Sequence, residues 1–154
     1  MSSAAERLAA LGLTLPPVTA PVAAYVPAVR TGSYVYVSGQ LPVVDGKLPA
    51  TGKVGDAVSA QDAAGMARTC ALNALAAAAD AAGGLDAIVR IVKVLGFVAS
   101  APGFNGQPQV VNGASELLIE VFGEAGRHAR SAVGVAELPL DAPVEVELIA
   151  EVRA

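Results

Sequence analysis

The segment from residue 59 to residue 84 constrains the fold most, because it predicts a long helix with very little side-chain bulk. Alanine dominates it up to about Ala82, Ser59 is suited to cap its start, and Gly83-Gly84 is suited to stop it. A helix of this kind must lie close against a sheet or another helix to bury its surface. Its few larger residues form a modest apolar face: Met66, Cys70, Leu72 and Leu75.

The rest of the chain alternates β-rich runs with one more helical run. The expected strands are Ala23–Val29, Tyr34–Val37, Ala87–Ala99, Ala129–Val135 and Val144–Val152, and the second long helix is Pro108–Phe122. The first two strands are expected to form a hairpin around Arg30–Ser33. The order β-β-α-β-α-β-β predicts an α+β fold with two helices on one face of the sheet. The other face would remain apolar and would need a partner.

A short helix is expected at the start of the chain, because Ser3-Ala4-Ala5-Glu6 has the spacing of a capping box. It should end near Gly12. The prolines that follow, at positions 16, 17, 21 and 27, predict an extended stretch and argue against a membrane-spanning helix. We therefore expect an N-terminal extension over residues 1–21 and one globular domain over residues 22–154.

The composition bears on partners and location. Hydrophobic residues make up 54% of the chain and charged residues 16%, which predicts that apolar surface is covered in subunit interfaces. The net charge is −4 and the basic residues are scattered singly, which counts against a nucleic-acid partner. The chain lacks a leader pattern and contains one cysteine, so we expect a cytoplasmic protein without disulfides or membrane attachment.

The lone histidine and the lone cysteine favour ordinary structural roles. A metal site needs several ligands at suitable spacing, and nothing near His128 supplies them, so a surface or turn position is expected. Cys70 lies among alanines, which favours burial over a catalytic thiol. Gly103–Gly106 lacks the lysine and the spacing of a phosphate-binding loop. The sequence thus predicts neither a metal nor a nucleotide cofactor.

Charged residues at the last two strands leave two interpretations open. The final expected strand carries three glutamates on one face: Glu145, Glu147 and Glu151. In the preceding expected strand, Arg130 comes just before an apolar run. Taken alone, they favour a solvated face and a salt-bridge partner at its rim. Likewise, Ser38-Gly39-Gln40 either ends a strand in the ordinary way or lets a ligand approach the backbone at Gly39.

Several motifs occur in the order found in the RidA (YjgF) family. They are Tyr25, Ser38-Gly39-Gln40, Val111-Asn112, Ala129-Arg130-Ser131, Leu138-Pro139 and Val144-Glu145-Val146-Glu147. From about residue 22 onward the chain resembles this family. The resemblance implies a chorismate-mutase-like fold with one mixed sheet, assembled as a homotrimer around an inner barrel with clefts between subunits. It also implies hydrolysis of small carboxylate-bearing imines and enamines to 2-keto acids and ammonia, without a cofactor.

The resemblance implies a role for each matching residue. Arg130 resembles the arginine that binds the substrate carboxylate, and a guanidinium fork fits a carboxylate bidentately. Glu147 resembles the acidic residue that activates water or relays a proton. Tyr25 would line the cleft from a neighbouring subunit. The other matching positions would shape the cleft or contact the ligand: Ser38, Gly39, Asn112 and Ala132.

The chain also departs from the family pattern. Ala132 replaces a usual cysteine, His128 replaces a usual proline, and one additional residue separates Asn112 from Arg130. These departures keep two other functions open. One is a carboxylate-binding regulatory protein that retains the cleft without turnover. The other is an endoribonuclease, against which the acidic net charge and the lack of a basic stripe argue.

Overall fold

The computed structural model describes residues 1–18, 20–21 and 23–154. The helices are α1 (Ala4–Ala10), α2 (Ala60–Ala82) and α3 (Gln107–Phe122), and short 3₁₀ turns lie at Leu85–Ala87, Gly123–Gly126 and Pro139–Asp141. The strands are β1 (Ala28–Thr31), β2 (Tyr34–Gln40), β3 (Ile88–Ala99), β4 (Ala129–Val135) and β5 (Val144–Val152). The domain boundary expected after residue 21 falls at Val22, which lies outside the described residues, and it stays a prediction.

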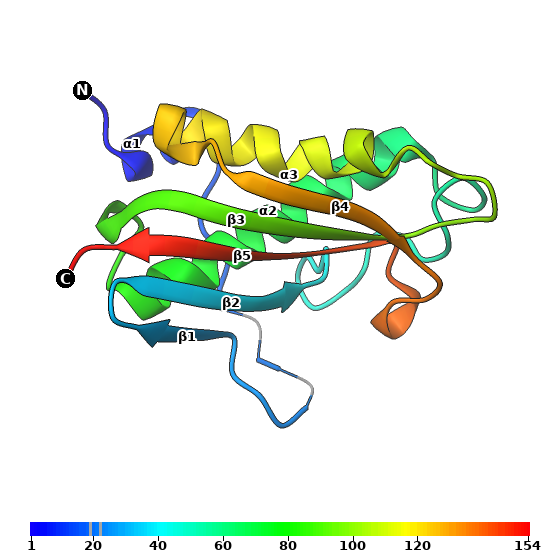
Figure 1. The fold of residues 1–154 in the computed structure, drawn as a ribbon, viewed down its shortest axis with the longest axis horizontal. Helices are drawn as coiled ribbons and strands as arrows, with labels where there is room; N and C mark the ends of the chain where they lie inside the picture. Colours follow the sequence, from blue (N-terminus) through cyan, green and yellow to red (C-terminus); the bar gives the residue numbers. More distant parts are fainter. Residues whose placement is uncertain (19, 22) are drawn as a thin grey trace.

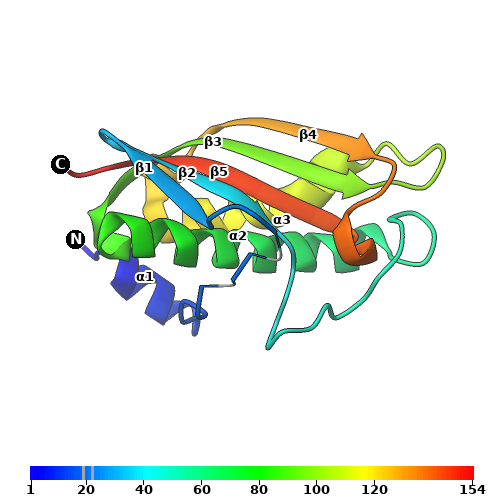
Figure 2. The same cartoon turned by 90° about the horizontal axis from the view of Figure 1, so that it is seen from below.

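The strands form one sheet in the order β1-β2-β5-β3-β4. Neighbouring strands are antiparallel except β3 and β4, which are parallel and joined through α3, as a parallel pair requires a crossover. Helices α2 and α3 lie side by side against one face of this mixed sheet, and the other face carries no helix (Figures 1 and 2). The α+β fold and the order of elements predicted from the sequence are confirmed.

The first strand is where the prediction was wrong. It was expected over Ala23–Val29 with a turn at Arg30–Ser33, but β1 starts at Ala28 and runs to Thr31, so the turn is only two residues long. Pro27 has no N–H to donate to a ladder, which explains the late start. Gly32 takes a φ of 58°, the left-handed conformation that a tight hairpin turn requires.

The alanine-rich helix α2 has the caps that its sequence predicted. The Ser59 side chain accepts a hydrogen bond from the backbone N–H of Asp62 at 3.0 Å, and Gly83 ends the helix with a φ of 89°. The helix approaches α3 so closely that a Cβ on Gly113 would collide with the carbonyl of Ala64. Small side chains therefore allow two helices and the sheet to pack as one core.

The N-terminal helix α1 is part of the same packed body. Its capping box is present: the Ser3 hydroxyl accepts from the Glu6 backbone N–H at 3.2 Å, and the Glu6 carboxylate accepts from the Ser3 backbone N–H at 2.8 Å. Asp86 accepts from the backbone N–H of Ala5 at 2.9 Å, and Leu8 joins the hydrophobic core beside α3. None of the helices in the described part of the chain is long and apolar enough to cross a membrane.

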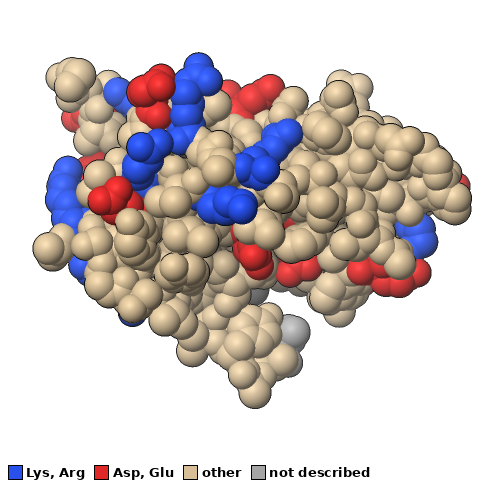
Figure 3. Space-filling view, viewed as in Figure 1, with Lys and Arg blue, Asp and Glu red and all other residues tan. Residues whose placement is uncertain are grey.

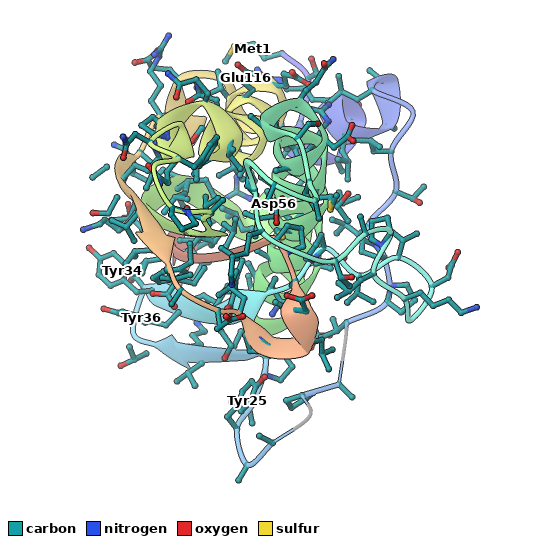
Figure 4. All side chains as sticks on the ribbon, turned by 90° about the vertical axis from the view of Figure 1, so that its right-hand side faces the viewer. Met1, Tyr25, Tyr34, Tyr36, Asp56 and Glu116 are labelled. Carbon is teal, nitrogen blue, oxygen red and sulfur yellow. The ribbon has the colours of Figure 1, made fainter. Side chains whose placement is uncertain are left out.

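The helix-free face of the sheet is a mixture of apolar and charged residues. Along β5 the valines, Leu148 and Ala150 are buried under the helices, while the three glutamates and Ile149 point to the opposite side. Tyr34 and Tyr36 of β2 project from the helix-free face (Figure 4). Seen from the direction of Figure 1, uncharged residues cover most of the surface (Figure 3). The exposed apolar residues on the helix-free face include Val29, Tyr34, Tyr36 and Val133.

Candidate functional site

A β-bulge interrupts β2 at the Ser-Gly-Gln motif. Val37 pairs with Leu148 and Gln40 pairs with Val146, so Ser38 and Gly39 together stand opposite a single residue of β5. Bulges of this kind bend a strand and redirect its side chains, and they occur often beside active sites. The Ser38 hydroxyl donates to the Val26 carbonyl at 2.6 Å, which ties the segment before β1 to the bulge.

The Glu145 carboxylate lies directly over Gly39. A Cβ at position 39 would collide with Oε1 and Cδ of Glu145, so only glycine leaves room for this carboxylate. Glu145 and Gly39 line a cavity of about 300 Å³ that also includes Tyr25, half exposed on the loop before β1 (Figure 4). The remaining wall is largely apolar and comes from Pro27, Leu41, Val43, Pro139 and Leu140, among others.

The surroundings of Glu145 favour its protonated form. Partial burial raises the pKa of Glu145 above its usual value of 4.5, and repulsion from the nearby Glu147 carboxylate raises it further. Glu147, which the family resemblance implied to be the acidic residue of the site, lies on the same strand face but does not line this cavity. The structure therefore brings Tyr25 and Gly39 together with Glu145, two residues earlier than expected. The sequence signal for this contact was Gly39 itself, since a glycine at the end of a strand leaves room for a group to approach the backbone.

Arg130 lies at a different place, on the edge strand β4 beside α3. Its Nη1 donates to Asn112 Oδ1 at 2.8 Å and to Ser115 Oγ at 3.2 Å, and Nη2 donates to the Pro108 carbonyl at 3.4 Å. None of the ion pairs among the described residues includes Arg130. The guanidinium is thus held on one side by neutral acceptors, and its Nε–H is left without an acceptor in the described part of the chain.

Arg130 and the glutamates of β5 lie on opposite faces of the sheet. Arg130 pairs with Val94, which pairs with Leu148, and residues directly across from one another share a face. Val94 and Leu148 are buried under the helices, so the Arg130 side chain is on the helix side. Glu145 and Glu147 are on the helix-free side. A single copy of the chain therefore does not bring the predicted arginine and a β5 carboxylate together.

Two further predicted positions lie near Arg130. Asn112 is hydrogen-bonded to it, as given above, and Ala132 is two residues further along the same face of β4, packed against the core. His128, expected at a turn, does precede β4, but its ring is half buried and hydrogen-bonded to Ser115 and to the Gly126 carbonyl. The sequence did not predict a role for Ser115, because a serine inside a helix belongs to no recognisable motif.

Metal and thiol chemistry find little support in the described residues. No group of three or more His, Cys, Asp or Glu side chains in the described part of the chain is arranged to hold a metal ion. Cys70 is fully buried against β5, with its thiol 3.7 Å from the Val144 carbonyl, and burial raises its pKa. The packing role expected for this cysteine is confirmed.

Comparison with known proteins places these features in a family. Residues 5–152 match the family model described as "YjgF/chorismate mutase-like, putative endoribonuclease". The chain is 45% identical over 150 residues to Protein TCP17 of Trypanosoma cruzi, covering 97% of this chain and 94% of that protein. The fold agrees with the crystal structure of Atu1372 from Agrobacterium tumefaciens, a protein of unknown function, with a TM-score of 0.90, 47% identity, and 98% and 94% of the two chains covered.

A third relative has a ligand in its structure. The crystal structure of E. coli TdcF with bound serine matches with a TM-score of 0.65 and 31% identity, covering 91% of this chain and 94% of TdcF. The family match extends over nearly the whole chain, and the mixed sheet with its covering helices agrees with the chorismate mutase-like fold that the family is described by. The protein is therefore a member of the YjgF/chorismate mutase-like family.

Proposed function

We propose that the protein hydrolyses reactive 2-imino and enamine acids to 2-keto acids and ammonia, in a cleft formed between two copies of the chain. The observation that carries this proposal is the fixed, carboxylate-free guanidinium of Arg130. A guanidinium held by neutral acceptors keeps its charge and a donor edge for a ligand carboxylate. Serine bound to the relative TdcF is a small molecule with such a carboxylate.

The second catalytic group in this proposal is Glu145, in place of the Glu147 expected from the sequence. Glu145 lines the same cavity as Tyr25, and its raised pKa suits a group that must be protonated part of the time. Glu147 would assist indirectly, because its negative charge helps to raise the Glu145 pKa. Ser38 and Gly39 would shape the cleft through the bulge, and Asn112 would hold Arg130.

The proposed reaction uses these groups in sequence. Arg130 of one copy binds the substrate carboxylate, which brings the imine carbon against the Glu145 side chain of a second copy. Glu145 protonates the substrate, at carbon for an enamine or at nitrogen for an imine, and then takes a proton from the attacking water. Glu145 then returns that proton to the nitrogen of the tetrahedral adduct, and the C–N bond breaks to release ammonia. As the C=O bond of the 2-keto acid forms, the hydroxyl proton passes to Glu145, which is left protonated for the next turnover. A second copy is needed because Arg130 and Glu145 lie on opposite faces of the sheet; a homotrimer would supply it.

The test is an ammonia-release assay in which a dehydratase generates 2-aminoacrylate. We expect Arg130→Ala and Glu145→Gln each to lose about 100-fold or more of the catalysed rate, the usual size of a lost acid–base group, whereas Glu147→Gln loses only a few-fold. Refolding a mixture of the Arg130→Ala and Glu145→Gln chains should restore activity, because some interfaces then pair an intact arginine with an intact glutamate. A wild-type rate equal to the spontaneous rate would refute the proposal for this substrate.

A second candidate function follows from Ala132. The family's usual cysteine is replaced there by a side chain that cannot react, while the arginine and its supports remain, so the cleft is suited to bind a 2-keto acid without turnover. Calorimetry with 2-oxobutanoate separates the two functions. Tight binding lost in Arg130→Ala, together with no rate above background in the assay, would favour the binding protein over the enzyme.

A further inference from the structure

Ser115 and His128 form a chain of hydrogen bonds that ends on Arg130. His128 Nδ1 lies 2.6 Å from the Gly126 carbonyl oxygen, and His128 Nε2 lies 2.9 Å from Ser115 Oγ. A carbonyl oxygen only accepts, so Nδ1 carries the ring proton and Nε2 of a neutral ring accepts from the Ser115 hydroxyl. With its own proton so committed, Ser115 Oγ accepts from Arg130 Nη1 at 3.2 Å. Donors and acceptors are then assigned for all three hydrogen bonds: His128 donates to Gly126, Ser115 donates to His128, and Arg130 donates to Ser115.

The surroundings favour the neutral ring that this chain needs. Burial lowers the pKa of His128 from 6.5, and the Arg130 guanidinium lowers it further. The other charges nearby come from two elements. Arg127, next to the ring in sequence, is paired with Glu124 at 3.1 Å, and Arg90 of β3 donates to the Arg127 carbonyl. From α3, Ser115 and Ile119 face the same small cavity of about 210 Å³ as His128, Arg127 and Arg130.

We propose that Ser115 and His128 are positioning residues that hold the Arg130 guanidinium in the orientation needed to bind a carboxylate. The inference deepens the proposed function and rests on it for the identity of the ligand. An arginine side chain has many rotamers, and a flexible one loses binding energy when the ligand fixes it. Asn112 and Ser115 accept from the two protons of Nη1, and the Pro108 carbonyl accepts from Nη2, so the guanidinium cannot rotate freely. Its Nε–H and the second proton of Nη2 remain for a ligand.

This role also accounts for the departure from the family pattern at residue 128. A proline at that position could neither accept from Ser115 nor be held by Gly126. The pair Ser115 and His128 instead supplies a polar support from α3 and from the loop before β4, 13 residues apart in sequence. Ser115 is 9% exposed, so its hydroxyl requires the two partners that it has, and the pair is expected to act as a unit.

The first test is nuclear magnetic resonance of the ring nitrogens, and it needs no ligand. The chain has one histidine, so ¹⁵N-labelled histidine gives the signals of His128 alone. We expect the Nδ1–H tautomer, titration below 6.5, and slow rotation of the Arg130 guanidinium that becomes fast in Ser115→Ala and on protonation of the ring. An Nε2–H tautomer, or a guanidinium equally mobile in wild type and Ser115→Ala, would overturn the proposal.

The second test measures binding of 2-oxobutanoate by calorimetry above the histidine pKa. Ser115→Ala and His128→Leu should each weaken binding about tenfold, the size of one lost charged hydrogen bond, and His128→Gln should recover part of it because it retains an acceptor. Thr69→Ala is the matched control, since Thr69 is also a helix hydroxyl but donates only to the Gly65 carbonyl.

The outcomes separate the two proposals. If wild type binds and only Arg130→Ala loses binding, the positioning role is wrong while the carboxylate site stands. If wild type itself does not bind 2-oxobutanoate, the proposed ligand class fails, and the ring tautomer and guanidinium rotation still decide whether Ser115 and His128 hold Arg130.

Discussion

Glu145 and Glu147 are two residues apart on one strand face, yet their surroundings differ. Glu145 lies over the backbone of Gly39 inside a largely apolar cavity, whereas Glu147 stands opposite the bulge and outside that cavity. Burial and the charge of its neighbour raise the pKa of Glu145. A period-two pattern in the sequence treats both residues alike, so the difference between them comes entirely from what packs against each.

The raised pKa of Glu145 predicts a dependence of stability on pH. Between its ordinary value of 4.5 and the raised value in the folded protein, the folded chain binds more protons than the unfolded chain. The free energy of unfolding should therefore fall as pH rises through this window. Glu145→Gln removes the titration, so urea unfolding over a pH series should show a gap between variant and wild type that widens with pH. Parallel curves for the two proteins would contradict this.

Among the elements, β2 contributes most to the candidate site through its bulge. The two-for-one pairing at Ser38 and Gly39 changes which residues of β2 face the helices, so that Gln40 is buried after Val35 and Val37. It also opens the space above Gly39 that Glu145 fills. The strand thus ends in a redirected backbone, and the loop that follows completes the cavity wall with Leu41 and Val43.

Replacing the bulge glycine tests this arrangement. In Gly39→Ala the new Cβ meets the Glu145 carboxylate, which is the mobile end of a long side chain and can swing away. We expect activity in the ammonia-release assay to fall about tenfold or more, with only a small change in the urea midpoint. Gly65→Ala is the control, because a Cβ there meets nothing within 4 Å and should leave activity intact. Full activity in Gly39→Ala would show that the carboxylate need not lie over residue 39.

On the scale of the whole molecule, the helix-free sheet face and the divided site point to association. Two tyrosines and two valines are exposed on that face, and each is more than 40% accessible: Val29, Tyr34, Tyr36 and Val133. Exposed apolar groups gathered on one face are typical of protein interfaces. The same association would let Arg130 of one copy approach Glu145 of another, which a single copy keeps on opposite sides of its sheet.

Sedimentation measurements test the association. Wild type should sediment as an oligomer, consistent with the homotrimer that we propose. Tyr36→Glu should shift it toward the monomer, because it places a charge within the patch that association would bury. Val44→Glu is the matched control, because Val44 is similarly exposed but lies in the loop that Asn73 of α2 holds from the helix side. Tyr36→Glu, with the smaller sedimenting mass, should also lose activity in the ammonia-release assay, whereas Val44→Glu should keep both the oligomeric mass and the activity of wild type. A monomeric wild type would contradict both the interface and the shared cleft.

The local elements and their order could be predicted from the sequence, because each depends on residues close together in the chain. The capped alanine helix, the alternation in β5 and the buried Cys70 all follow from period, caps and side-chain size. The family motifs likewise pointed to Arg130, Asn112, Tyr25 and Gly39. The prediction failed for the first strand: the apolar composition of residues 23–29 predicted a strand there, but β1 begins only after Pro27, which has no N–H to donate to a neighbouring strand.

The arrangement of the site was decided only by the tertiary structure. The bulge places Glu145 rather than Glu147 over Gly39, the register of β4 against β3 puts Arg130 on the helix side, and the packing of α3 brings Ser115 to His128. Each of these depends on pairing between segments far apart in sequence, where a shift of one residue moves a side chain to the opposite face. The sequence by itself determined which helices and strands form; long-range register determined which polar groups meet.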